Sequence, residues 1–229
     1  MKISIIIPAF NEAKTIENLL KKVEKLDFSA LKYEKEIIIV DDFSTDGTRD
    51  ILKNYSKKHT VIFRDKNGGK ADAVNDGFKT STGDVVIVQD ADLEYNPEDI
   101  NSLLKTMVET GADVVYGSRF MGGNNKLFSI PHYYLGNRLL VAALNILYFS
   151  NITDIETCYK LIKRDIWSRL NLKRSRFDIE PEITGKLLRM GYKIKEVPIS
   201  YNPRGFGEGK KISIKDGIKA LFVLVSERF

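Results

Sequence analysis

The sequence predicts an α/β protein with a mostly parallel sheet and helices on both faces. In its first half, short aliphatic runs alternate with amphipathic stretches of helical length, which is the pattern of parallel strands joined by crossover helices. The runs at residues 5–7, 37–40 and 85–88 are apolar at every position, as in strands covered on both faces. A composition that is 43% hydrophobic over 229 residues permits a sizeable core and excludes a disordered chain.

The first half contains five expected strands, at residues 3–7, 36–40, 61–63, 85–88 and 114–116. Between them, apolar residues recur at spacings of three and four, which predicts helices at residues 12–26, 46–59, 70–80 and 97–110. Asp46 before a helical pattern, Pro97 at a first helical position and Gly111 after a last periodic residue are matching start and stop signals.

In the second half of the chain, the expected strands and helices no longer alternate regularly. A stretch rich in Gly, Asn and Pro at residues 120–132 leads into a mostly apolar helix at 134–149. A strand at 158–162, a helix at 182–190 and a strand at 193–201 complete the expected core, and a basic glycine-rich loop at 203–211 and an amphipathic segment at 214–225 follow. With no internal repeat and no linker, we expect one domain over residues 1–229.

Charge and cysteine content exclude several classes of protein. The 36 basic and 31 acidic side chains give a net charge of +5, but the lysines are scattered, so charge does not indicate a nucleic-acid partner. Cys158 is the single cysteine, which excludes an intrachain disulfide and favours a reducing compartment. The longest uncharged run, residues 139–153, is shorter than the roughly twenty apolar residues of a membrane-spanning helix. With no secretory signal in view, we expect a cytoplasmic location.

Polar side chains follow four of the expected strands, at residues 8–12, 41–44, 89–94 and 117–119. Ligands of open α/β sheets gather at the carboxyl ends of strands. Asp90 and Asp92 point to one side if the strand stays extended there, and Mg²⁺ or Mn²⁺ is the natural partner of such a pair. Glu94, two residues further, could complete a metal site. The alternative is that these are turn or helix-capping residues before Pro97.

Two weaker signals lie at other strand ends. Asp41 and Asp42 fit turn chemistry, but an acidic residue there can also accept hydrogen bonds from a base or a ribose hydroxyl. Gly68 and Gly69 would let backbone amides approach an anion, with Lys70 as a point charge, although a plain helix start is the alternative.

Taken in order, these motifs resemble glycosyltransferase family 2, whose members have the GT-A fold. The resemblance rests on residues 8–12 (Pro-Ala-Phe-Asn-Glu), the pair at 41–42, Asp-Ala-Asp at 90–92 and Gly-Ser-Arg at 117–119. Further matches look like the polyprenyl-phosphate subgroup, of the dolichyl-phosphate mannose and glucose synthase type: Gly-Asn-Arg at 136–138, Glu-Val-Pro-Ile at 196–199, and Arg204.

The resemblance covers essentially the whole chain and implies a role for each matching residue. It implies a donor half at about residues 1–118, an acceptor half at about 119–211 and a C-terminal amphipathic helix at about 212–229. The residues implied to line the nucleotide base and ribose are Pro8, Phe10, Glu12, Val40 and Asp42. Those implied to hold the donor diphosphate and its Mg²⁺ or Mn²⁺ are Asp90, Ala91 and Asp92, with Glu94 where mannose synthases carry glutamine. Those implied to contact the acceptor phosphate are Arg119 and Arg138, and those implied to close over the diphosphate are Arg204 and Lys210.

The activity that the resemblance implies is an inverting, metal-dependent transfer of a hexose from a nucleotide-diphosphate sugar to a polyprenyl phosphate. Such an acceptor is already anionic and needs no general base. The alternative is a hydroxyl acceptor in glycan synthesis, which would need a carboxylate base. The candidate bases, each of which could instead bind sugar hydroxyls or be a solvated surface charge, are Asp154, Glu156, Glu180 and Glu182. A basic nucleic-acid-binding protein is a remoter, non-enzymatic alternative.

Two segments suggest a membrane surface. The nearly uncharged stretch at residues 127–153 could receive a lipid tail, with Arg138 drawing the phosphate head, or it could be a buried core helix. The segment at 214–225 could lie on a membrane. We therefore expect either a peripheral protein at the cytoplasmic membrane face or one that depends on a membrane-anchoring partner.

Overall fold

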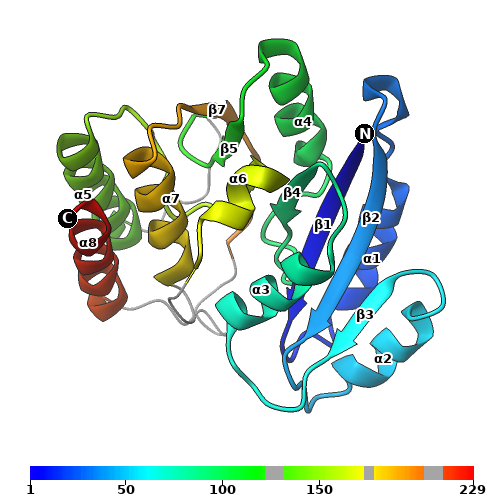
Figure 1. Cartoon of the computed structure of the whole chain (residues 1–229). Helices are drawn as coiled ribbons and strands as arrows, with labels where there is room; N and C mark the ends of the chain where they lie inside the picture. Colours follow the sequence, from blue (N-terminus) through cyan, green and yellow to red (C-terminus); the bar gives the residue numbers. More distant parts are fainter. Residues whose placement is uncertain (122–130, 173–177, 204–213) are drawn as a thin grey trace.

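The structure is a computed structural model of the chain, and it describes residues 1–121, 131–172, 178–203 and 214–229. A seven-stranded sheet with the strand order β3-β2-β1-β4-β6-β5-β7 forms its centre (Figure 1). The strands are β1 (Lys2–Ala9), β2 (Glu34–Asp41), β3 (Thr60–Phe63), β4 (Val85–Val88), β5 (Val114–Ser118), β6 (Lys160–Lys163) and β7 (Ile194–Pro198). All seven expected strands are present, so the α/β prediction is confirmed.

All strands of this sheet are parallel except β6, which pairs antiparallel with both β4 and β5. The strands β1, β2, β4, β5 and β7 consequently point the same way. Their carboxyl ends, and the polar residues that follow them, therefore lie along one edge of the sheet.

The described helices are α1 (Ile16–Lys25), α2 (Thr48–Tyr55), α3 (Lys70–Thr80), α4 (Asp99–Thr110), α5 (Pro131–Tyr148), α6 (Arg164–Arg169), α7 (Ile179–Arg189) and α8 (Ile214–Arg228), with a 3₁₀ turn η1 (Ser29–Leu31). The main difference from the sequence expectation is that α1 begins four residues late. Residues 12–15 form a turn in which Thr15 and Ile16 donate backbone hydrogen bonds to the Glu12 carbonyl. The two short elements, η1 and α6, have too few residues to produce a helical period and were not expected.

Helices cover both faces of the sheet. Figure 1 shows α1 behind β1 and β2, with α3 and α6 in front of the sheet. Phe78 of α3 and Trp167 of α6 have ring centroids 5.7 Å apart, which joins these two helices on the same face. The core on both faces consists of aliphatic strand residues, and the strand residues Ile3, Ile5, Ile6 and Ile7 are fully buried.

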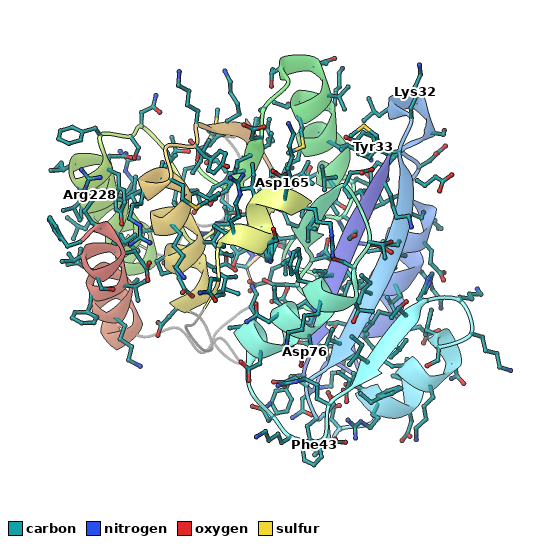
Figure 2. All side chains as sticks on the ribbon, in the orientation of Figure 1. Lys32, Tyr33, Phe43, Asp76, Asp165 and Arg228 are labelled. Atoms are coloured by element: carbon teal, nitrogen blue, oxygen red, sulfur yellow. The ribbon has the colours of Figure 1, made fainter. Side chains whose placement is uncertain are left out.

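A second, smaller core lies away from the sheet. The helices α5, α7 and α8 stand together at one side of the molecule, where Figure 2 shows their side chains around Arg228. Leu144 of α5 and Leu224 of α8 are fully buried in this cluster, and the Tyr148 hydroxyl donates a 2.8 Å hydrogen bond to the Leu224 carbonyl. Among the described residues, no helix is long and apolar enough to cross a bilayer.

Candidate active site

The site predicted from the sequence lies at the carboxyl end of β1, where the strand order of the sheet changes direction. Strand β1 has β2 on one side and β4 on the other, and the carboxyl ends of all three open at the same edge. In open α/β sheets this switch point is the usual place for a ligand. The residues that follow β1, β2, β4 and β5 are brought together there from four separate parts of the chain.

Asp42, at the end of β2, organises the glycine loop before α3. Its carboxylate accepts hydrogen bonds from the backbone N–H groups of Gly68 (2.9 Å) and Gly69 (2.7 Å) and from the Arg64 guanidinium. Gly69 has φ = 86°, a conformation that glycine adopts without the strain of a Cβ. The neighbouring Asp41 is fully buried and pairs with Arg49 at 2.7 Å. In this structure Asp42 therefore holds the loop that delivers Lys70, and contact with a nucleotide stays a prediction.

The other residues expected to line the nucleotide have different degrees of access. Phe10 is 39% exposed, whereas the Val40 side chain is fully buried beside Ile38 and Ala73. The Val40 side chain therefore cannot reach a ligand, and only its backbone remains for that role. The Glu12 N–H donates to Thr48 at 2.8 Å, and its carboxylate accepts from Thr15 at 2.7 Å, so these contacts hold the turn after β1.

The acidic segment after β4 does not continue as a strand. Residues 91–94 form a turn in which the Leu93 φ is 61°, and Asp92 Oδ1 accepts the Glu94 N–H at 3.1 Å. The alternation that would point residues 90, 92 and 94 to one side is therefore interrupted. Glu94 instead accepts a 2.6 Å hydrogen bond from the Tyr201 hydroxyl. Ala91 is buried beside these carboxylates.

Asp90 is paired with a lysine. Lys70 Nζ lies 2.7 Å from Asp90 Oδ1 and 3.0 Å from Glu180 Oε1. Burial by itself would lower the pKa of Lys70, but the neighbouring carboxylates outweigh it and raise that pKa well above its ordinary value. Lys70 therefore carries its positive charge at the predicted metal site.

Arg119, after β5, is buried and clamped by Asp154. Its Nε and Nη2 donate to the two oxygens of Asp154 at 2.7 and 2.8 Å, and its backbone N–H donates to the same carboxylate at 3.0 Å. The guanidinium also stands over the Tyr201 ring, 5.1 Å from its centroid. This bidentate pair fixes Arg119 at the carboxyl edge of the sheet. A contact with an acceptor phosphate stays a prediction.

The remaining candidate bases divide into paired and unpaired groups. Glu180 is buried between Lys70 and Lys160, whose ammonium groups lower the pKa of its carboxyl although burial alone would raise it. Glu182 is fully buried and pairs with Lys186 at 2.7 Å. For Glu156, burial raises the pKa to about 7, and among the described residues its buried Oε1 has no hydrogen-bond partner. Glu156 thus differs from the other three in having no direct ion pair within the described part of the chain.

The basic residues predicted to contact phosphate are only partly described. Arg138 is exposed on α5, next to Asn137, whose amide atoms are buried and have no hydrogen-bond partner among the described residues. Arg204 and Lys210 lie outside the described residues. The predicted phosphate contacts of all three basic side chains stay predictions.

Sequence reasoning gave no role in the site to three residues that build it, although Glu196 belongs to the motif at 196–199. Lys160 holds Glu180, Arg64 holds Asp42, and Glu196 accepts the backbone N–H groups of Thr153 (2.8 Å) and Asp154 (3.1 Å). Each is a charged residue within a hydrophobic strand or just after one. That is the signal that could have marked them as buried partners.

The carboxylates available for a divalent cation are those of Asp90 and Asp92. Within the parts of the chain that the structure describes, no three His, Cys, Asp or Glu side chains gather closely enough to hold a metal ion, so Glu94 does not complete a set with the two aspartates. Two aspartate carboxylates do fit Mg²⁺ or Mn²⁺, because such ions take oxygen ligands and leave positions for substrate phosphates and water. The Lys70 ammonium that pairs with Asp90 shows that the Asp90 carboxylate binds a positive charge at this position.

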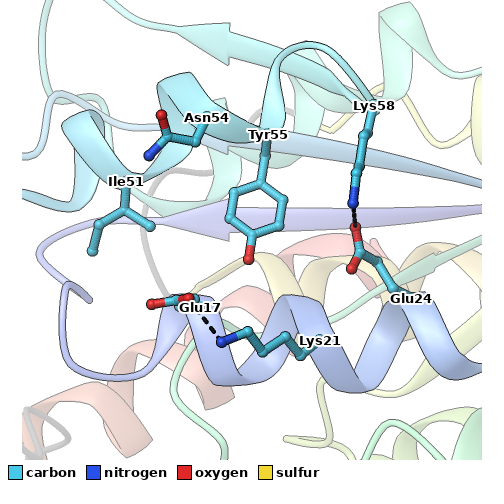
Figure 3. Close-up of a pocket in the computed structure, with 7 residues that line it drawn as sticks. All are labelled: Glu17, Lys21, Glu24, Ile51, Asn54, Tyr55 and Lys58. Atoms are coloured by element: carbon cyan, nitrogen blue, oxygen red, sulfur yellow. Dashed lines mark hydrogen bonds and ion pairs between the residues drawn. The ribbon is translucent and has the colours of Figure 1, made fainter.

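Of two surface grooves, one is remote from the aspartates at 90 and 92, and the other borders the site at Glu94. One of about 350 Å³, between α1 and α2, is lined by side chains that pair with one another, including Lys21 with Glu17 at 2.8 Å and Lys58 with Glu24 at 3.9 Å (Figure 3). A larger one of about 1070 Å³ adjoins the β4 loop near Tyr201. Neither groove includes the aspartates at 90 and 92.

Comparison with known proteins agrees with this arrangement. A sequence model described as "Glycosyl transferase family 2" matches residues 4–170. A dolichol-phosphate mannosyltransferase of Pyrococcus furiosus is 33% identical over 216 residues, which are 92% of this chain and 59% of that protein. The chain thus spans less than two thirds of that relative. A dolichyl-phosphate beta-glucosyltransferase of Trichomonas vaginalis is 29% identical over 95% of this chain and 70% of its own length.

Solved structures give the fold. Glucosyl-3-phosphoglycerate synthase from Mycobacterium tuberculosis, crystallised with Mn²⁺, UDP and glucosyl-3-phosphoglycerate, superposes with a TM-score of 0.72 over 99% of this chain and 79% of that one, at 20% identity. A crystal of that enzyme with Mg²⁺ and UDP superposes with a TM-score of 0.71, also at 20% identity. The chain therefore has the GT-A fold of these glycosyltransferases.

Proposed function

The chain belongs to glycosyl transferase family 2 and is a glycosyltransferase, and from that premise we propose that it moves a hexose from a nucleotide-diphosphate sugar to a polyprenyl phosphate. Support for the acceptor class comes from the two relatives named for dolichyl-phosphate transfer. We further propose that the transfer depends on Mg²⁺ or Mn²⁺ and inverts the anomeric configuration. Nucleic acid has no part in this proposal.

The observation that carries the choice of acceptor is the state of the candidate bases. A hydroxyl acceptor needs an ionised carboxylate to take its proton, whereas a phosphate acceptor brings its own negative charge. Asp154 is bonded to Arg119, Glu180 to Lys70 and Lys160, and Glu182 to Lys186. Because three of the four candidates are buried and already neutralised by a cation, the site is better suited to an anionic acceptor.

The residues would act in the transfer as follows. Asp90 and Asp92 would hold the divalent cation, which when bound supplies positive charge for the leaving diphosphate. Lys70 would add a positive charge on the same side, and Arg204 and Lys210 would close over the diphosphate. Arg138 and Arg119 would draw the acceptor phosphate toward the anomeric carbon. No residue is required to remove a proton.

A second candidate function is transfer to a sugar hydroxyl, and one observation favours it. Glu156 has a pKa of about 7 and no ion pair with any residue that the structure describes, and a base with a pKa near the working pH is efficient. The variant Glu156→Gln separates the two functions, because it removes a proton acceptor without changing the shape of the side chain. A loss of about 100-fold or more in kcat would favour the hydroxyl acceptor, and an unchanged kcat would favour the phosphate.

We propose that the enzyme is peripheral at the cytoplasmic membrane face and docks through the exposed side of α5 and α8. Among the described side chains there, five large apolar ones are at least 64% exposed: Leu139, Ile146, Phe149, Phe222 and Phe229. An exposed apolar patch of this kind marks an interaction site, and a polyprenyl acceptor would be reached at a membrane.

Co-sedimentation with phosphatidylcholine vesicles containing phosphatidylglycerol tests this docking surface. We expect the double variant Phe149→Ser/Phe222→Ser to bind vesicles at least about tenfold more weakly, since two large apolar side chains are lost from the lipid contact. Val108→Ser, on exposed α4, is the matched control. Equal binding of all three proteins would refute the docking surface and favour a membrane-anchoring partner.

The acceptor itself is tested by product analysis. The protein is incubated with Mn²⁺, a panel of UDP- and GDP-sugars, and polyprenyl phosphate beside simple sugars, and the products are identified by mass spectrometry. We expect a glycosyl polyprenyl phosphate, and a β-linked product from an α-linked donor. Sugar transfer to a hydroxyl alone would overturn the proposed acceptor, and an α-linked product would overturn inversion.

A further inference from the structure

Lys70 occupies a position between the two halves of the chain. As the first residue of α3, it follows the glycine loop that Asp42 holds. Its ammonium lies between Asp90, at the end of β4, and Glu180, in the first turn of α7. The side chain is 15% exposed, so both ion pairs are screened only weakly by solvent.

Glu180 is itself fixed, and this fixes the position of Lys70. The second carboxylate oxygen of Glu180 pairs with Lys160, which is almost fully buried. Lys160 Nζ also donates to the backbone carbonyls of Ile155, at 3.0 Å, and Thr157. All three N–H groups of Lys160 therefore have acceptors, so this lysine is held in place by two backbone carbonyls and in turn holds Glu180. Lys70 has two carboxylate partners, one on each side.

This arrangement has a consequence for cation binding. An ammonium on Asp90 and a divalent cation on the same carboxylate would repel each other strongly in a partly buried site. A cation that arrives alone therefore finds one of its two predicted aspartate ligands already neutralised. A nucleotide diphosphate changes this balance, since its phosphate oxygens can take the ammonium and also supply ligands to the cation.

We propose that Lys70 is the counter-ion of Asp90 in the donor-free enzyme, and that Asp90 is released to a divalent cation only when a diphosphate draws the Lys70 ammonium away. The inference rests on the proposed function and deepens it. It makes cation and nucleotide binding cooperative, so that the enzyme takes up the pair and binds the free cation weakly. By linkage, each ligand then strengthens the other by the same factor.

The variant Lys70→Met tests this by calorimetry, because methionine keeps the length of the side chain and removes its charge. We expect Mn²⁺ alone to bind roughly tenfold more tightly to Lys70→Met than to the native protein. We expect metal-free UDP or GDP to bind roughly tenfold more weakly, and the cooperativity to disappear. Lys79→Met is the matched control, since Lys79 is an exposed residue of the same helix and pairs with Asp76 at 3.1 Å.

A second variant guards against a simple effect of net charge. Lys70→Met/Glu180→Gln removes one charge of each sign, so the buried net charge stays as in the native protein while Asp90 loses its ammonium. We expect this double variant to bind Mn²⁺ alone as tightly as Lys70→Met does. If neither variant gains affinity for Mn²⁺ alone, the counter-ion role is wrong. If the native protein binds no nucleotide diphosphate even with Mn²⁺, the proposed function fails, and the Mn²⁺ comparison still decides the role of Lys70.

Discussion

Replacing Glu156 with glutamine should make the protein more stable at alkaline pH and leave it nearly unchanged at acid pH. The Glu156 carboxyl has a pKa of about 7, raised from 4.5 chiefly by burial. Glu180 and Asp154 raise it further, while Lys160 and Arg119 oppose the rise. Glutamine has the shape of the protonated glutamate and stays neutral at every pH, so it removes the cost of the buried charge.

The sign and size follow from linkage. A carboxyl whose pKa is higher in the folded protein keeps its proton longer there, so its contribution to stability is full below the unfolded value of 4.5 and is lost as pH rises through about 7. The difference between the two pKa values corresponds to about 3 kcal/mol, with most of the loss between about pH 5 and 7. For a chain of this length, that is a difference in Tm of about 6–12 °C at about pH 8.

Urea unfolding of both proteins from about pH 5 to 8.5 measures this difference directly. We expect the free energies of unfolding to differ by about 1 kcal/mol or less at the acid end and to diverge to about 3 kcal/mol as the pH rises. Glu109→Gln, at an exposed glutamate of α4, is the matched control and should follow the native curve within about 0.5 kcal/mol. Parallel curves for the native protein and Glu156→Gln would mean that Glu156 is ionised at little cost, and the reasoning from burial would be wrong.

Three further variants test other parts of the site. Asp92→Ala should lower transfer by roughly 100-fold or more with Mn²⁺ present while leaving the circular dichroism spectrum unchanged; native turnover would remove Asp92 from the metal site. Asp154→Asn should cost about 3–5 kcal/mol in urea unfolding because it leaves the buried Arg119 guanidinium without its counter-ion. The exposed ion pair between Lys163 and Asp113 is the control, and Asp113→Asn should lower the free energy of unfolding by about 1 kcal/mol or less. Arg138→Ala should raise the KM for polyprenyl phosphate far more than the KM for the donor, and equal changes would contradict an acceptor role.

The order of helices and strands could be predicted from the sequence because it depends on local periodicity. Uninterrupted apolar runs such as Ile37–Val40 require a strand that is buried on both faces. Amphipathic segments require a helix with only one face buried. The edge of the sheet that carries the site could also be predicted from the sequence, because parallel strands place their carboxyl ends together. The antiparallel β6 could not be assigned its direction, since a run of four strand residues from Lys160 to Lys163 pairs equally well either way until its neighbours are known.

The sequence also determined which residue types meet at the site, since ordered motifs place aspartates, glycines and arginines at successive strand ends. Only the tertiary structure decided their partners. The turn at Leu93 separates Glu94 from the aspartates, and the position of α7 brings Glu180 between Lys70 and Lys160. Pairing between charges far apart in the chain depends on distance and burial in the folded molecule, and neither is encoded in any local pattern.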